Sequence, residues 1–330
     1  FPMSIPPQRT LASSASLEGT SLHTGSKVTL TMSPAPPNSG ILFRRIDLDD
    51  QPFIPAIVDN VQQVERSTTI AVGSVKVHTV EHVISALTGM GVDNAIIEMD
   101  ANEPPIGDGS AAPYVECIKK DGIKDQDQLC SVFEVREPIH IEVGNGSLIT
   151  IVPDKAFRVS CTQVGPEGKM TQYFSTAITP ETYEREIAPA RTFVFYEDVE
   201  PLLAKGLIKG GSLENAVVVR DNSVLSKEPL RFEDEFARHK ILDVIGDLML
   251  AGKRIMGHVI CVKPGHGPNT QMARQQKVHH VRVGRDVALR SLPREEGEAR
   301  RADGVVSCYV LERGERLWEP FLCARHNFSL

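Results

Sequence analysis

The stretch LRFEDEFARHKILDVIGDLML, residues 230–250, shows a different pattern on each face of one expected helix. At about 100° per residue, His239, Asp243 and Asp247 follow one another at intervals of one turn on one face. An imidazole and a carboxylate at positions i and i+4 are spaced to bind one cation, although an amphipathic helix with a solvated polar face has the same spacing. The pattern predicts a long helix from about residue 232 to residue 252. Apolar residues form its other face: Ile241, Leu242, Ile245, Leu248 and Met249.

The composition of the whole chain is that of a globular protein. Its 330 residues are 41% hydrophobic and 24% charged, which is enough for two domains with cores of their own. The net charge of −7 argues against nucleic-acid binding, which needs concentrated lysine and arginine. No apolar run approaches the length of a membrane span, so no membrane insertion is expected. The six cysteines are scattered without a CxxC pair, which indicates reduced thiols and a cytoplasmic location.

Strand-like and helix-like segments alternate in two successive blocks. In the first block, short β-branched strands precede a helical pattern for which Thr79 is the expected N-cap, and residues 106–120 add a glycine-rich turn and a second helix. The polar segment KKDGIKDQDQ, residues 119–128, is the predicted boundary. Strands then return, followed by a helix that opens with Thr179 as its cap and Pro180 in its first turn. The sequence therefore predicts an α+β fold of two similar layers, each a sheet covered by helices.

Two further segments contain residues suited to catalysis. HTVEHVISAL, residues 78–87, places Glu81 beside His82 on the polar side of a short helix. A neutral imidazole binds zinc and a neighbouring carboxylate can take a proton from zinc-bound water, whereas a surface glutamate beside a hydrogen-bonded histidine is the more common case. KPGHGPN, residues 263–269, places His266 in a loop between two glycines, where it either faces a cleft or is simply solvated.

These three segments complete one another chemically. Two histidines and an aspartate leave one position of a tetrahedral zinc open for water, and a glutamate and a further histidine are available as base and acid. Open-coordination zinc with such partners indicates hydrolysis of an amide or an ester.

Five collinear parts of the chain resemble the UDP-3-O-acyl-N-acetylglucosamine deacetylases of lipid A synthesis. The resemblance covers about residues 8–273, and the combination of HKILDxIGD with TVEH and GH is highly specific. The matching parts are SLHTG (21–25), TVEHVISAL with GVDNAIIE (79–98), IGDGSAAPYV (106–115), ARTFVFYEDVE with GLIKGGSLENAVVV (190–219), and the opening stretch with GHGPNT (230–270).

The resemblance implies a catalytic centre with one zinc ion per chain. By this resemblance the zinc ligands would be His82, His239 and Asp243. Glu81 would be the general base. His266, held by Asp247, would stay cationic, stabilise the oxyanion and protonate the leaving amine.

The resemblance also implies residues that contact the substrate. Thr192 would donate to the oxyanion, Phe193 would pack on the sugar, and Lys240 would face the anionic nucleotide. An acyl passage would lie within about residues 195–219, where Leu203 and Leu207, with Leu202 and Ile208, provide apolar surface; an ordinary amphipathic helix is the alternative. His23 in SLHTG is a weaker match, and we do not expect it to be essential.

The family's fold would be two similar two-layer α/β sandwiches with the active site between them. Here they would be residues 1–125 and residues 126–274, the second with the acyl passage and most of the zinc site. Residues 275–330 form a basic tail that departs from the family pattern and receives no role.

The function predicted from the sequence is that of a cytoplasmic, monomeric zinc amidase acting on a small molecule. It would remove acetate from UDP-3-O-(3-hydroxyacyl)-N-acetylglucosamine. One alternative is a zinc amidase of the same fold acting on another N-acetyl sugar. The other is a non-catalytic binder of acylated nucleotide sugars, which is disfavoured because a binder needs neither Glu81 nor the pair of His266 and Asp247.

Overall fold

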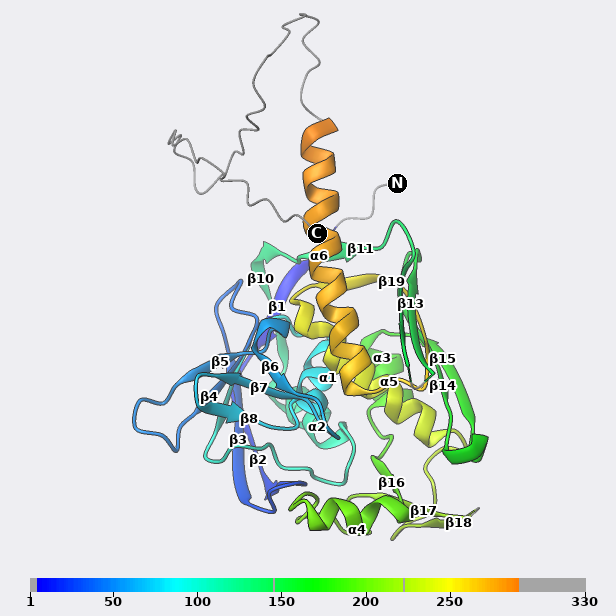
Figure 1. Cartoon of the computed structure of the whole chain (residues 1–330). Helices are drawn as coiled ribbons and strands as arrows, with labels where there is room; N and C mark the ends of the chain where they lie inside the picture. The colour runs from blue at the N-terminus through cyan, green and yellow to red at the C-terminus, as the bar shows by residue number, and fades with distance from the viewer. Residues whose placement is uncertain (1–4, 145, 222, 291–330) are drawn as a thin grey trace, which may run out of the picture. The chain divides into compact units, whose positions relative to one another are not determined.

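Two β-sheets with the same strand pattern form the framework of the fold (Figure 1). The computed structural model describes residues 5–144, 146–221 and 223–290, with residues 279–290 described by their backbone only. The first sheet has the order β2 (Ala15–Thr20), β3 (Lys27–Pro34), β9 (Ala95–Met99), β4 (Ile41–Arg45) and β5 (Phe53–Pro55). The second has the order β12 (Ile139–Val143), β13 (Ser147–Val152), β19 (Arg254–Val262), β14 (Phe157–Gln163) and β15 (Gln172–Ala177).

The pairing of strands repeats from one sheet to the other. In each sheet the central strand, β9 or β19, comes last in the chain and inserts between earlier strands. Strand β9 runs parallel to β4, and β19 runs parallel to β14. All the remaining pairs of neighbours in these two strand orders are antiparallel. This repetition confirms the predicted α+β fold with two layers of similar construction.

Helices from both halves of the chain meet between the two sheets. In Figure 1, α1 (Glu81–Gly89) and α5 (Glu235–Leu248) lie between the first sheet on the left and the second sheet on the right. Helix α1 packs on α5 and on α2 (Ala112–Asp121), and α5 covers β14 and β15. One hydrophobic cluster contains buried residues from α1, α2, α5 and β14, with Phe174 of β15 packed against it, so the two halves share a core.

Helices α1 and α5 approach each other closely at a glycine. A Cβ atom built on Gly246 would lie 2.2 Å from the carbonyl oxygen of Glu81, far inside contact distance. Only a residue without a side chain lets the two backbones meet here. The first turn of α1 is therefore held directly against α5.

Further strands and helices complete the described chain. The strands outside the two orders given above are β1 (Pro7–Leu11), β6 (Val61–Gln63), β7 (Thr69–Val72), β8 (Val75–Val77), β10 (Ile123–Leu129), β11 (Val132–Glu134), β16 (Phe193–Phe195), β17 (Val217–Arg220) and β18 (Ser223–Leu225). The remaining helices are α3 (Pro180–Thr182), which continues as a π-helical turn (Tyr183–Ile187), α4 (Tyr196–Ala204) and α6 (His266–Arg290). Single 3₁₀ turns are formed by Val58–Asn60, Pro166–Gly168 and Met249–Ala251.

One predicted feature differs from the structure and one agrees. The predicted boundary segment 119–128 contains the end of α2 and most of β10, whose backbone pairs with β1. The helix predicted for residues 232–252 is shorter, because the 3₁₀ turn and left-handed Gly252 follow Leu248. Thr179 caps α3 as predicted, with its hydroxyl accepting from the Thr182 backbone.

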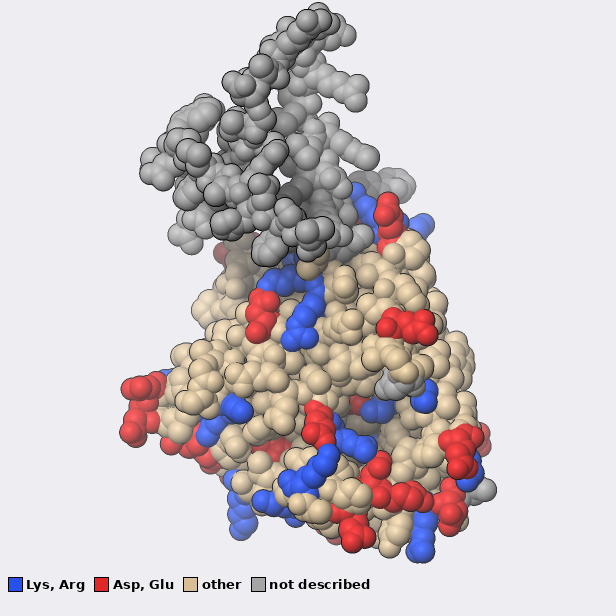
Figure 2. Space-filling model, viewed as in Figure 1, with Lys and Arg blue, Asp and Glu red and all other residues tan. Residues whose placement is uncertain are grey.

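The predicted tail begins inside a helix. Helix α6 continues past residue 275 to Arg290, and residues 291–330 lie outside the described part of the chain. None of the helices in the described ranges combines the length and hydrophobicity needed to cross a membrane. On the face shown in Figure 2, lysine and arginine side chains are interspersed with aspartate and glutamate.

Candidate active site

Helices α1 and α5 bring three buried side chains together: His82, His239 and Asp243. One ligand atom from each lies within 4.8 Å of the other two. Asp243 Oδ1 is 3.5 Å from His239 Nε2 and 3.8 Å from His82 Nε2. The predicted ligand residues are therefore adjacent, and they form a group that could hold a metal ion.

The surroundings of these three residues suit a cation. The second oxygen of Asp243 accepts a hydrogen bond from Lys240 Nζ at 3.0 Å, and His239 Nδ1 donates to the carbonyl of Ala190 at 3.0 Å. These bonds leave Oδ1 and the Nε2 atoms facing one another. Within the described part of the chain, the buried Nδ1 of His82 also has no hydrogen-bond partner.

Electrostatics keeps the three groups in the form that metal binding requires. Burial lowers the pKa of His82 to about 3 and also lowers that of His239, so both imidazoles are neutral at neutral pH. Burial alone would raise the pKa of Asp243, but the charges of Lys240 and the nearby histidines hold it well below its usual range. Two neutral imidazoles and one carboxylate are ligands that zinc prefers.

A second group of side chains adjoins the first. His266 Nδ1 donates to Asp247 Oδ2 at 2.9 Å, and His266 Nε2 lies 3.7 Å from Glu81 Oε1. Burial raises the pKa of Glu81 to about 8. For His266 burial acts downward, but the charges of Asp247 and Glu81 outweigh it and raise the pKa to about 9. A cationic imidazole next to a carboxylate base is an arrangement for moving protons.

His266 is the first residue of α6, and not the loop residue that the sequence predicts. Pro268 follows in the first turn, where its missing N–H costs nothing. Thr270 Oγ1 donates to the carbonyl oxygen of His266 at 2.7 Å and fastens this end of the helix. The imidazole is thus held by regular structure on a rigid element.

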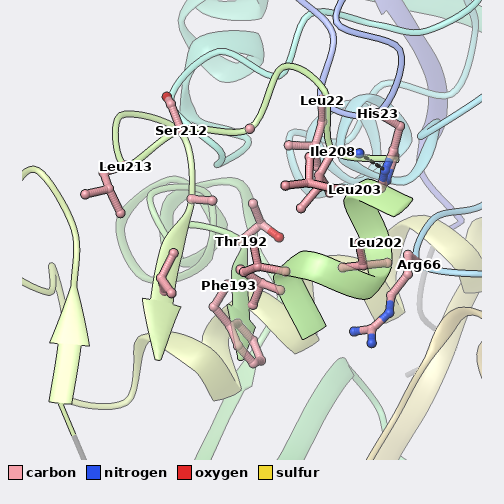
Figure 3. A pocket seen from close by; sticks show the side chains of 15 residues that line it. Leu22, His23, Arg66, Thr192, Phe193, Leu202, Leu203, Ile208, Ser212 and Leu213 are labelled. Carbon is pink, nitrogen blue, oxygen red and sulfur yellow. Dashed lines mark hydrogen bonds between the residues drawn. The ribbon is translucent and has the colours of Figure 1, made fainter. Parts of the chain in front are cut away.

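The described chain contains a cavity of about 250 Å³ (Figure 3). Apolar side chains dominate its lining, which comes from α4, β16, β17 and the loops around them. Leu202, Leu203 and Ile208, which the resemblance assigns to an acyl passage, line it, and so do Thr192 and Phe193. The Phe193 ring centroid is 6.3 Å from that of His239, so one residue of the cavity wall lies close to a metal-ligand candidate.

Two of the predicted substrate residues have other surroundings. Leu207 is not among the residues that line the cavity; its backbone N–H bonds to the Leu202 carbonyl beyond the end of α4. Lys240 is paired with Asp243, and its ammonium group lies 5.6 Å from the Phe193 ring centroid.

Glu103 organises the edge of the site beside His23. Its buried carboxylate accepts the backbone N–H groups of His23 and Thr24 and the hydroxyl of Thr79. The hydroxyl of Thr79 is therefore not the predicted cap of α1; Val80 stands at the N-cap position without a side-chain bond. Thr79 instead adopts φ of 53°, a strained conformation for a β-branched residue, next to Glu81 and His82.

Sequence reasoning missed several residues of the site. Thr68 Oγ1 donates to Asp247 Oδ1 at 2.6 Å, and Asn269 Nδ2 donates to Asp247 Oδ2 at 2.9 Å. Arg66 lines the cavity and pairs with Asp198 of α4 at 2.8 Å. In the sequence, Thr68 lies in a strand-like segment, residues 67–72, and Asn269 lies in GHGPNT, but neither pattern assigns the residue a role in the site.

The comparisons with known proteins agree with this geometry. A family model described as UDP-3-O-acyl N-acetylglycosamine deacetylase matches residues 8–277. The chain is 44% identical over 270 residues to the UDP-3-O-acyl-N-acetylglucosamine deacetylase of Myxococcus xanthus, covering 81% of this chain and 85% of that protein. It is 45% identical to the protein of the same name from Anaeromyxobacter, covering 81% and 88%, and 43% identical to that from Geobacter, covering 80% and 87%. The chain therefore belongs to the UDP-3-O-acyl N-acetylglycosamine deacetylase family.

Proposed function

We propose that this chain hydrolyses the acetamide of UDP-3-O-(3-hydroxyacyl)-N-acetylglucosamine, using one zinc ion held by His82, His239 and Asp243. Membership of the family makes the chain an amide hydrolase of lipid A biosynthesis. The observation that carries the mechanism is the adjacency of the buried metal-ligand group and the pair of Glu81 and His266. The products would be acetate and the free amine of the sugar.

Each group has a distinct task in this proposal. Zinc held by the three ligands would supply Lewis-acid chemistry, lowering the pKa of a water molecule and polarising the acetamide carbonyl. Glu81 accepts a proton from the attacking water, and its burial makes it a stronger base than an exposed glutamate. His266 supports the oxyanion with its charge and gives its Nε2 proton to the leaving nitrogen as the C–N bond breaks. The proton on Glu81 can then return to His266 across 3.7 Å.

The substrate would be bound beside these groups. The apolar cavity supports a site for the acyl chain, with Leu203 in contact with that chain and Phe193 packing on the sugar. We propose that Thr192, which lines the same cavity, donates its hydroxyl to the oxyanion. Lys240 forms an ion pair with Asp243. We propose that its positive charge also attracts the anionic nucleotide.

Further features of the sequence-based prediction stay proposals. We propose two domains, residues 1–125 and 126–274, with the site at their junction, since α1 comes from the first and α5 from the second. We also propose a cytoplasmic monomer. The free cysteines at positions 117, 130, 161 and 261 fit a reducing compartment.

The first test is acetate release from the purified full chain, before and after chelation and zinc addition. Activity that is lost with chelator and restored with about one zinc per chain is expected. Glu81→Gln should bind zinc normally yet lose roughly 100- to 10,000-fold in kcat, because it removes the base and no ligand. If folded, zinc-loaded wild-type protein releases no acetate, the proposal is wrong.

A substrate panel separates the remaining alternatives. An amidase for another N-acetyl sugar would release acetate from that sugar with or without the UDP group. A non-catalytic binder would retain the acylated nucleotide sugar unchanged. The proposed function requires that both the UDP and the acyl chain increase kcat/KM.

A further inference from the structure

Thr68 contacts both carboxylates of the proton-transfer group. This fully buried residue lies in the loop between β6 and β7 and precedes β7 directly. Its backbone N–H donates to Glu81 Oε2 at 3.0 Å, and its hydroxyl donates to Asp247 Oδ1 at 2.6 Å. Its carbonyl oxygen accepts the N–H of Val80 at 3.2 Å, which ties the same residue to the start of α1.

The contacts form a closed ring of four residues. From Thr68 the ring passes through Glu81 to His266 Nε2, then from His266 Nδ1 to Asp247 and back to the Thr68 hydroxyl. Every member is buried. Because a carboxylate accepts at both oxygens, the Thr68 bonds determine which oxygen remains for His266. They occupy Glu81 Oε2 and Asp247 Oδ1, leaving Glu81 Oε1 toward His266 and Asp247 Oδ2 for its Nδ1–H.

We propose that Thr68 is a positioning residue for the reaction, which sets the orientation of the Asp247 carboxylate and through it the His266 imidazole. The inference rests on the proposed function, since Thr68 has this task only if His266 delivers a proton. The Thr68 hydroxyl acts through Asp247, and the Thr68 backbone N–H fixes the orientation of the Glu81 carboxylate by bonding to its Oε2. Supporting hydrogen bonds of this kind hold catalytic groups within the narrow geometry that proton transfer needs.

The test is Thr68→Val, which removes the hydroxyl and preserves the size and branching of the side chain. We expect kcat for acetate release to fall roughly 10- to 100-fold, with KM and zinc content close to those of the wild type. Thr68→Ser, which restores the donor, should recover most of the activity. Thr69→Val is the matched control: the neighbouring threonine is also buried, but its hydroxyl bonds to His78 instead of a catalytic group.

A double-mutant cycle distinguishes positioning from general support of the fold. If Thr68 acts through Asp247, then Thr68→Val should cause little further loss of kcat in an Asp247→Ala background. If Thr68→Val does not fold, Thr68→Ala replaces it, both alone and in the Asp247→Ala background, since a smaller apolar side chain fits the same space.

Three results would overturn the inference in an active wild-type enzyme. They are a kcat of Thr68→Val within about twofold of the wild type, an equal loss in Thr69→Val, or an undiminished further loss in the Asp247→Ala background. An inactive, zinc-loaded wild type would instead refute the proposed function, so the two failures are distinguishable.

Discussion

His266 lies between two carboxylates, and this position decides its protonation state. An ordinary buried histidine is neutral, because burial disfavours the charged imidazole. Here the charges of Asp247 and Glu81 reverse that effect and raise the pKa of His266 to about 9. His82 and His239, on the metal-ligand side, have lowered pKa values instead. The two carboxylates on one side and burial on the other thus keep the acid and ligand histidines in opposite charge states at the same pH.

The pH dependence of the reaction follows from this difference. A general acid must carry its proton, and His266 loses its proton as the pH rises through about 9. We therefore expect kcat/KM to fall above about pH 9. In Asp247→Asn, the loss of the negative charge should move this alkaline limb to lower pH, besides lowering the rate. Profiles of kcat/KM for acetate release in the two proteins measure the shift, and coincident alkaline limbs would rule out the pairing as the cause.

Local spacing was sufficient for some residues of the site and insufficient for others. His239, Asp243 and Asp247 could be placed on one helix face because helical periodicity fixes their relation. Thr68 is 179 positions from Asp247 in the sequence, and an ordinary threonine before a strand gives no local sign of such a bond. Thr79 was misassigned as a cap because the acceptor of its hydroxyl, Glu103, lies beyond the next strand.

At the scale of elements, α4 has two different environments along its length. Leu202 is buried in the cavity wall, whereas Leu203 lines the cavity and is 51% exposed. Two ion pairs, Arg66 with Asp198 and Lys205 with Glu65, attach this helix to the loop that ends at Thr68. An exposed apolar side chain at a cavity indicates surface that is covered when a ligand binds.

Leu203→Asn should therefore discriminate between substrates by their acyl chains. We expect kcat/KM for a long-acyl substrate to fall roughly 5- to 30-fold, because about 1–2 kcal/mol of apolar contact is lost. UDP-N-acetylglucosamine without an acyl chain should react as it does with the wild type. Leu225→Asn is the control, since Leu225 is similarly exposed on β18 and does not line the cavity. An equal loss with both substrates would contradict an acyl-binding role.

The boundaries of elements were harder to predict than their existence. The helix α5 and the strands of the second sheet follow clear apolar patterns. The strand β10 has no such pattern, because its polar side chains are largely exposed and only its backbone pairs with β1. Backbone pairing between distant segments leaves little trace in side-chain periodicity, so the sequence alone does not indicate this strand.

At the scale of the whole molecule, the metal-ligand group joins the two halves of the chain. His82 comes from α1, and His239 and Asp243 come from α5, so a cation held by all three links both layers through their shared core. The similar construction of the layers could be predicted from the repeated blocks of strands and helices. Their common order of strands could not, because the insertion of β9 and β19 at the centre depends on long-range pairing.

Zinc should accordingly stabilise the folded chain. At a free zinc concentration about 100 times the dissociation constant, binding adds about 2.7 kcal/mol, which corresponds to a rise in Tm of roughly 4 °C for a chain of 330 residues. Thermal unfolding with chelator and with added zinc measures the difference. Asp243→Ala, which lacks one ligand, should show a much smaller response. A wild-type Tm that is the same with and without zinc would argue against a metal held at this junction.

The contact between Gly246 and the Glu81 carbonyl also limits how the enzyme can evolve. Any replacement at position 246 adds a Cβ atom that would lie 2.2 Å from the backbone carbonyl oxygen of Glu81, the proposed base. Relieving this clash would shift the first turn of α1, which carries both Glu81 and the neighbouring ligand candidate His82. Even alanine at position 246 would therefore disturb the site. The residues that line the cavity lie away from this contact, and their side chains can change without moving the crossing of α1 and α5.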